Sequence, residues 1–186
     1  TISNQFEGGS GGLFRVNVAV SGTCNAFCDG TSINFYNAGG GCNNTAYNDV
    51  VHHEYGHHVV STGGSGQGQY GEGTGDCMGI IISDQPILGF GFQGNCNAGI
   101  RTGSNTLLYP QAEASVEIHT AGQLISGCVW STRNALVAAA VPSYQTLLKK
   151  LCVNAVALHR GTAITPQITI DWLTIDDTDA NIANGT

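Results

Sequence analysis

The chain has 186 residues, a formal net charge of −7 and 41% hydrophobic residues. This length and composition predict a folded domain with a substantial core, whole or split into two lobes, and exclude an intrinsically disordered chain. Lys and Arg together number 6, and Lys149-Lys150 is their one cluster, so nucleic-acid binding is not expected. No apolar run is long enough to span a membrane.

The seven cysteines indicate a secreted, extracellular protein. None belongs to a Cys-x-x-Cys pair of the zinc-finger or redox type, so we expect disulfides formed in an oxidising compartment. Because seven is odd, one cysteine is free or pairs outside this chain. We favour Cys24 with Cys42, which flank a hairpin-like stretch, and the others could pair in several ways. The missing signal peptide and the loop-like end at residue 186 suggest a core cut from a longer precursor.

The first part of the chain predicts strands. Residues 13–20 alternate between apolar and other side chains, which is typical of a half-buried strand. The apolar positions, expected to face inward, are Phe14, Val16, Val18 and Val20. Residues 31–36 predict a second strand with Ile33 and Phe35 inward, and Asp29-Gly30 before it is a hairpin-turn signal.

A helix predicted over residues 45–61 carries the pattern His-Glu-x-x-His at His53, Glu54 and His57. Positions i and i+4 share one face of a helix, so two imidazoles can bind one metal ion while Glu54 holds a water. These are the minimal components for zinc-assisted hydrolysis of a peptide bond. Histidines also cluster on solvated helix faces, so the hypothesis needs a third ligand.

A second helix, predicted to begin near Glu72, supplies that ligand. Glu72 and Asp76 are four residues apart and share a face, so Glu72 can bind the metal and Asp76 can accept the outer N–H of a ligating histidine. Acids also favour helix N-termini, which explains Glu72 but not Asp76 beside the apolar run 78–82. The Gly-rich residues 62–71 lack the Lys and Ser/Thr of a phosphate-binding loop and are interpreted as a flexible connector.

The rest of the chain is Gly-rich and irregular over residues 83–110 and then predicts helices. One helix extends from His119 towards residue 140, and Pro142 and Pro166 open two more. His119 can donate a hydrogen bond to a developing oxyanion beside the metal. We therefore predict an α+β fold, with strands and metal helices in an N-terminal subdomain (1–112), a mainly helical subdomain (113–186), and an active site in the cleft between them.

These motifs resemble the thermolysin-like zinc metallopeptidases of the gluzincin clan, and among them the fungalysin branch, over about residues 16–119. The resemblance implies a zincin-type catalytic domain with zinc on His53, His57 and Glu72. It also implies that Asp76 in Gly-Glu-Gly-x-x-Asp orients a ligating histidine and that His119 in Glu-Ile-His-x-x-Gly stabilises the transition state.

Further positions follow from the same resemblance. Asn25-Ala26-Phe27 matches an edge strand that hydrogen-bonds the substrate backbone in this family, which gives Asn25 and Ala26 a substrate-binding role. The loop between the second histidine and the glutamate ligand is shorter here. The family's assisting tyrosine and carbonyl-binding arginine have no secure match, and Tyr70 and Arg101 are the nearest candidates.

Calcium is a second metal to consider. Asp49 resembles a position that the thermolysin branch uses for calcium, but of the family's further calcium ligands only Asp84 has a neighbouring match. Asp176, Asp177 and Asp179 could bind calcium, although an acidic solvated loop explains them better.

The expected function is that of a secreted zinc endopeptidase acting on proteins or peptides, in which Glu54 as general base deprotonates a zinc-bound water. The alternatives are an inactive zinc-bearing binding domain of a larger secreted protein and a gluzincin aminopeptidase, although no motif for an amine anchor is found. The resemblance also implies a prosegment outside this chain, and we expect a monomer.

Overall fold

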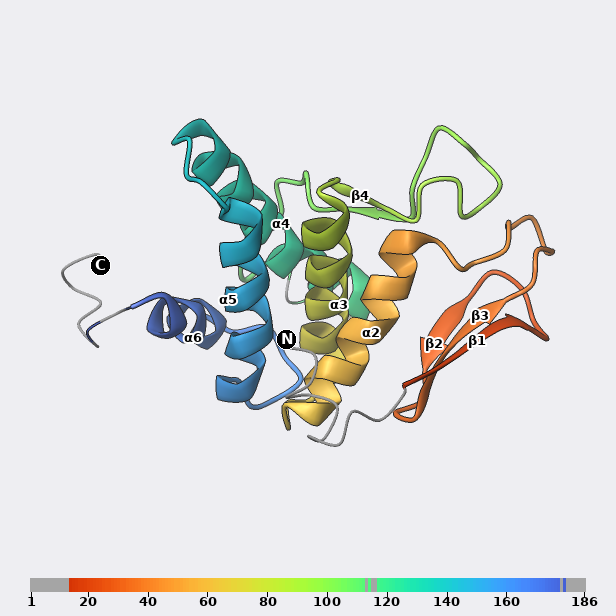
Figure 1. Ribbon diagram of the computed structural model, residues 1–186, viewed down its shortest axis with the longest axis horizontal. Helices are drawn as coiled ribbons and strands as arrows, with labels where there is room; N and C mark the ends of the chain where they lie inside the picture. Colours follow the sequence, from red (N-terminus) through yellow and green to blue (C-terminus); the bar gives the residue numbers. More distant parts are fainter. Residues whose placement is uncertain (1–13, 113, 115–116, 178, 180–186) are drawn as a thin grey trace.

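The computed structural model describes residues 14–112, 114, 117–177 and 179. They form the predicted mixture of helices and small sheets, with one sheet at one end of the molecule and the helices packed beside it (Figure 1). The helices are α2 (Asn48–Thr62), α3 (Gly68–Ser83), α4 (Ile118–Ala138), α5 (Tyr144–Leu158) and α6 (Gln167–Asp176). The strands are β1 (Arg15–Val20), β2 (Ala26–Cys28), β3 (Ser32–Tyr36), β4 (Ile87–Leu88) and β5 (Arg101–Thr102).

The first sheet has the order β1-β3-β2, with β1 parallel and β2 antiparallel to β3. The predicted hairpin turn joins β2 to β3, and its Asp29 carboxylate accepts hydrogen bonds from the backbone N–H groups of Thr31 and Ser32. Ile33 and Phe35 are buried, as expected, and pack in one cluster with Val50 of α2. This contact fixes the sheet against the helix that carries the histidines.

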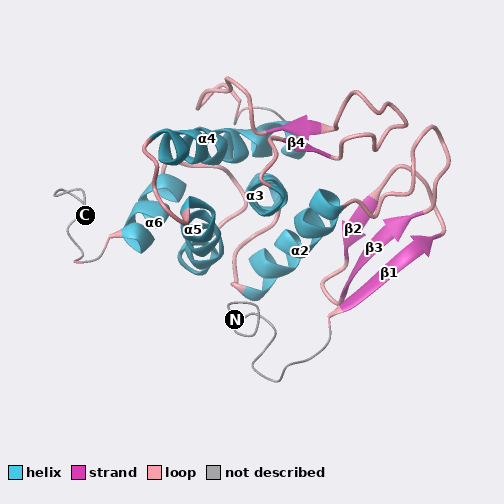
Figure 2. Ribbon diagram, turned by 45° about the horizontal axis from the view of Figure 1, so that its top comes forward, coloured by secondary structure: helices cyan, strands magenta, loops and turns pink. Residues whose placement is uncertain are grey.

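The inward orientation predicted for the valines of β1 is wrong for two of them. Val16 is 51% exposed and Val18 is 61% exposed. The reason is the place of β1 at the outside of the sheet, farther from α2 than β2 and β3 are (Figure 2). Alternation correctly indicated a strand, but an apolar face is buried only where another element covers it.

Helix α3 lies at the centre of the helical part, with α2 on one side and α4 and α5 on the other (Figure 2). It begins at Gly68, four residues before the predicted start, so part of the expected flexible connector is helix. Glycines allow its close contacts: a Cβ on Gly56 of α2 would lie 2.8 Å from Cα of Gly75 in α3. The close approach of these two helices brings their side chains to a common point.

The helical second half follows the prediction in type and order. The main hydrophobic core joins α3 to α4, α5 and α6 through buried side chains that include Ile80, Ile125, Leu148 and Val156. Residue 113, where the predicted second subdomain begins, lies outside the described residues, and the division into two subdomains stays a prediction. In the part of the chain that the structure describes, no helix is both long and apolar enough to cross a membrane.

Candidate active site

The three predicted ligands converge at the crossing of α2 and α3. His53 and His57 come from α2 and Glu72 from α3, and one potential ligand atom from each lies within 4.8 Å of the others. The two Nε2 atoms are 3.2 Å apart, and Glu72 Oε2 lies 3.3 Å from His53 Nε2. Two imidazole nitrogens and a carboxylate oxygen at one point form a group that could hold a metal ion.

The outer nitrogen of each ligating ring has its own partner. His53 Nδ1 lies 2.9 Å from Asp76 Oδ1, as the sequence predicted for Asp76. His57 Nδ1 lies 2.9 Å from Oε1 of Gln67, a residue to which the sequence analysis gave no role. Because a neutral imidazole carries one proton, a hydrogen on Nδ1 leaves the lone pair of Nε2 directed at the shared point.

The centre is built to hold positive charge. Burial would lower the pKa of His53, but the carboxylates of Asp76 and Glu72 outweigh it and raise that pKa to about 9. Burial and the neighbouring His53 lower the pKa of His57 to about 4. The two carboxylates therefore favour positive charge at this point of the structure.

Within the described part of the chain, no hydrogen bond reaches one of the Glu72 carboxylate oxygens. Its Oε2 is buried and lies 3.3 Å from Nε2 of both His53 and His119, in a geometry that makes a hydrogen bond with neither. A buried carboxylate oxygen in this position is stabilised by positive charge, from the imidazolium of His53 or from a bound cation. This oxygen is the feature of the structure that best fits a metal ion.

The two residues predicted to act on substrate flank this centre. Glu54 follows His53 on α2, is 6% exposed, and has a pKa raised by its burial. His119 stands in the first turn of α4 with its side chain partly exposed. Glu117, quoted in the motif but given no separate role, is the N-cap of α4, accepts from the backbone of His119 and Thr120, and also contacts His119 Nδ1. It therefore fixes both the helix start and the imidazole.

A cleft of about 570 Å³ runs past these residues. It is lined by the ligands, Glu54 and His119, and also by Asn25, Ala26, Phe27 and Arg101. Strand β2 ends the order β1-β3-β2, so one of its backbone edges is unpaired within this sheet. The predicted substrate strand thus borders the same cleft as the candidate metal ligands.

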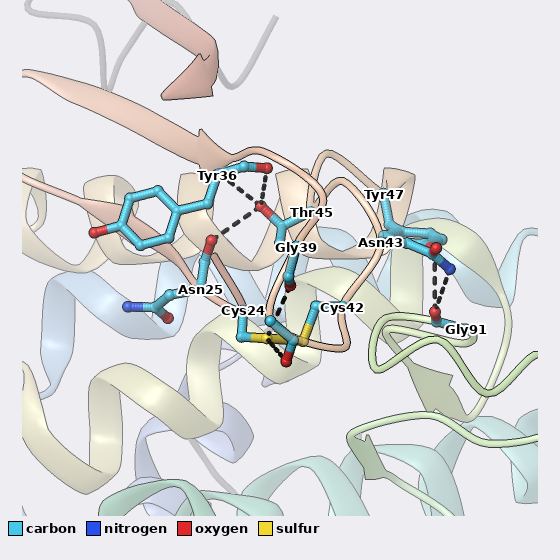
Figure 3. The surroundings of a disulfide bond; sticks show 10 residues. Cys24, Asn25, Tyr36, Gly39, Cys42, Asn43, Thr45, Tyr47 and Gly91 are labelled. Atoms are coloured by element: carbon cyan, nitrogen blue, oxygen red, sulfur yellow. Dashed lines mark hydrogen bonds between the residues drawn. A yellow bond between two sulfur atoms is a disulfide. The ribbon is translucent and has the colours of Figure 1, made fainter. Parts of the chain in front are cut away.

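A disulfide and a hydroxyl hold the start of β2 (Figure 3). Cys24 and Cys42 form the predicted disulfide immediately before Asn25. The hydroxyl of Thr45 donates to the carbonyl of Asn25 at 2.9 Å and accepts from the N–H of Tyr36 at 2.8 Å. These contacts anchor the Asn25 backbone and leave its side chain outside this hydrogen-bond set.

The candidates for the family's carbonyl-binding arginine and assisting tyrosine were Arg101 and Tyr70. Only Arg101 lies at the cleft. Arg101 lines the cleft and makes a bidentate contact with Asp76, with Nε and Nη2 each within 3.0 Å of a carboxylate oxygen. Tyr70 is 2% exposed and stacks on the ring of His159 at a centroid distance of 4.0 Å. Tyr70 thus belongs to the core, and the structure does not bring it to the cleft.

Three of the five acids considered for calcium have protein partners. Asp84 is bound by the guanidinium of Arg133 and the hydroxyl of Tyr144. Asp49 accepts from the backbone N–H of Gly89, and Asp177 accepts from that of Asp179. Each carboxylate therefore has a structural role that requires no calcium ion.

Neither the models of known protein families nor the curated proteins match this sequence.

Proposed function

We propose that the protein is a zinc-dependent endopeptidase with the zincin-type arrangement that the sequence resembles. The observation that carries the proposal is the convergence of His53, His57 and Glu72 at one point, where a buried Glu72 oxygen has no hydrogen bond from any described residue. Glu54 and His119 line the same cleft. A metal site alone would require neither of them.

The donor set favours zinc among the common metal ions. Two imidazoles and one carboxylate are a ligand set of catalytic zinc sites, whereas calcium and magnesium prefer oxygen ligands. Bound there, zinc would act as a Lewis acid that polarises a carbonyl group and lowers the pKa of water. The residues described above would hold it through Nε2 of each histidine and the Glu72 carboxylate.

Glu54 and His119 handle the protons of the reaction. Glu54 accepts a proton from the attacking water as oxygen adds to the peptide carbonyl carbon, and then transfers it to the leaving amide nitrogen as the C–N bond breaks. His119 donates from Nε2 to the oxyanion, while the Glu117 carboxylate contacts its Nδ1 and holds the ring in place. Burial of Glu54 favours proton uptake because it disfavours the charged carboxylate.

The peptide is aligned by β2. An extended segment can pair with the unpaired backbone edge beside Asn25 and Ala26, which lines the cleft. Backbone pairing is independent of side chains and of a free amino terminus, and this supports internal cleavage over aminopeptidase action. The disulfide favours an oxidising compartment, so we propose that the enzyme is secreted.

The test is the variant Glu54→Gln, which keeps the size of the side chain but cannot accept the proton. We expect cleavage of a peptide blocked at both ends to fall by roughly 10²- to 10⁴-fold, with zinc content unchanged because Glu54 is not a ligand. Cleavage at the wild-type rate by this variant would contradict the mechanism. Bound zinc without cleavage in the wild type would favour the inactive binding domain, and cleavage of unblocked peptides alone would favour an aminopeptidase.

A further inference from the structure

The Gly-rich segment between α2 and α3 is anchored at defined positions. The backbone N–H of Gly66 donates to the carbonyl of Gly161 at 3.1 Å, and the N–H of Tyr70 donates to that of Thr162 at 3.0 Å. A Cβ on Gly66 would lie 2.6 Å from the Gly161 oxygen, so glycine permits this close approach. The segment from Gly63 to the start of α3 is therefore held against the loop after α5, and it delivers Gln67 to a fixed place.

The side chain of Gln67 is directed at a single residue. Gln67 occupies the N-cap position of α3, yet its side chain makes no capping hydrogen bond. Its Nε2 donates to the backbone carbonyl of His57 at 2.9 Å, and its Oε1 lies 2.9 Å from Nδ1 of the same histidine. Both ends of one amide thus hold one metal-ligand candidate.

These two contacts determine the protonation of the histidine ring. A backbone carbonyl can only accept, so the amide must present its NH₂ group to the His57 carbonyl. Its oxygen then faces Nδ1, and that contact is favourable only if Nδ1 carries the hydrogen. The lone pair of the imidazole consequently lies on Nε2, the atom directed at His53 and Glu72.

Position 71 leaves room for this amide. A Cβ on Gly71 would lie 2.4 Å from Oε1 of Gln67, and the other close atoms around it also belong to Gln67. Gly71 lies in α3, where alanine is the better helix former. Glycine at this position lowers the intrinsic stability of the helix, but it leaves the space that the Gln67 amide occupies.

We propose that Gln67 is a positioning residue for His57, which fixes the tautomer and the orientation of its ring for metal binding, and that Gly71 keeps the space for it. The inference rests on the proposed metal site. It gives the Gly-rich connector a function in that site, which its sequence did not indicate.

The test compares zinc affinity, measured by competition with a chromophoric chelator, in the wild type, Gln67→Ala, Gly71→Ala and Gln69→Ala. Gln69 is the matched control, because it is the same residue type in the same helix turn and its amide oxygen accepts from the backbone N–H of Ile164. We expect the zinc affinity of Gln67→Ala to fall roughly 10- to 100-fold, and that of Gln69→Ala to stay at the wild-type level. Gly71→Ala should weaken zinc binding while the melting temperature of the metal-free protein stays the same or rises, a combination that a helix-stabilising effect alone does not produce.

Tautomer measurement provides a readout that needs no zinc. In ¹⁵N–¹H spectra of the metal-free protein, the His57 ring should carry its hydrogen on Nδ1 in the wild type and lose that preference in Gln67→Ala. Zinc affinity of Gln67→Ala within about twofold of the wild type would overturn the inference, since such partners are ordinarily worth at least tenfold. An equal loss in Gln69→Ala would overturn it too. Absence of zinc binding in the wild type would instead refute the proposed function itself.

Discussion

His119 is linked to the centre on one side and to its own helix on the other. Nε2 lies 3.3 Å from Glu72 Oε2, while Nδ1 contacts Glu117. Replacing His119 by alanine should lower kcat roughly 10²- to 10³-fold, because an oxyanion donor acts in the transition state. KM and zinc content should change little, since His119 is outside the ligand set. Steady-state kinetics and metal analysis check both expectations.

The control for this variant is His58→Ala. His58 lies on α2, one residue after a ligand, but its ring packs against that of Phe14 at a centroid distance of 4.0 Å. We expect this variant to keep near wild-type turnover. Similar losses in both variants would indicate that histidines support the fold here and that His119 has no special part in the reaction.

At the residue scale, the sequence predicts what depends on local spacing. His53 and His57 share a face of one helix, as Glu72 and Asp76 do on the next, and their convergence requires only that the two helices cross. Gln67 could not be found in this way, because its contact with His57 depends on the path of a loop. Tyr70 was a candidate without a secure motif match, and in the structure it is buried in the core.

At the element scale, the crossing of α2 and α3 sets the geometry of the ligands. A Cβ on Gly56 would lie 2.8 Å from backbone of Gly75, so Gly56→Ala must push the helices apart. We expect a loss of stability of about 1–3 kcal/mol from overpacking and weaker zinc binding, because Glu72 would move relative to the histidines. Thermal unfolding and zinc titration measure the two effects, with the exposed Thr62→Ala in α2 as control. If Gly56→Ala had the melting temperature and the zinc affinity of the wild type, the two helices would not be in close contact.

The end of α3 has its own electrostatic anchor. Asp84, its C-cap, accepts hydrogen bonds from Arg133 of α4 and Tyr144 of α5. The hydrogen bonds from Arg133, with that of Tyr144, lower the pKa of Asp84. A carboxylate whose folded pKa is lowered stabilises the protein above its unfolded pKa, near 3.9, and this contribution is lost as pH falls through the folded pKa.

Asp84→Asn should therefore reduce stability at pH 7 by about 1 kcal/mol, a modest value because the pair is partly exposed. The difference from the wild type should shrink as pH falls below about 4. Chemical denaturation at a series of pH values checks this, with the exposed Asp176→Asn as control. A difference that stayed constant down to low pH would mean that the charge of Asp84 is not what links the three helices.

Whether a segment forms a helix or a strand could be predicted from its periodicity. The ends of the elements and the burial of their side chains could not, because they depend on which other elements pack against them. The glycines near the start of α3 suggested a loop, yet two of them lie in close contact with other groups: a Cβ on Gly68 would lie 3.2 Å from the carbonyl oxygen of Thr162, and one on Gly71 would lie 2.4 Å from Oε1 of Gln67. Packing thus overrides their low helix propensity. In β1, Val16 and Val18 have the pattern of an inward face, but α2 does not cover them.

At the scale of the whole molecule, the cleft lies where its two kinds of structure meet. Strand β2 provides one border, α2 and α3 provide the candidate ligands, and the first turn of α4 provides His119. The disulfide between Cys24 and Cys42 holds the chain immediately before β2, at one end of this border. A metal ion joining α2 to α3 would bind the folded state alone, so added zinc should raise the melting temperature of metal-free protein.

The most direct test of the account is the zinc content of protein purified without chelators, measured together with cleavage of a peptide blocked at both ends. We expect about one zinc per chain, the capacity of a single His₂Glu site. Internal cleavage should stop when a chelator removes the metal and return when zinc is restored. Protein that holds no zinc under these conditions, or that cleaves equally well after zinc is removed, would contradict the central claim.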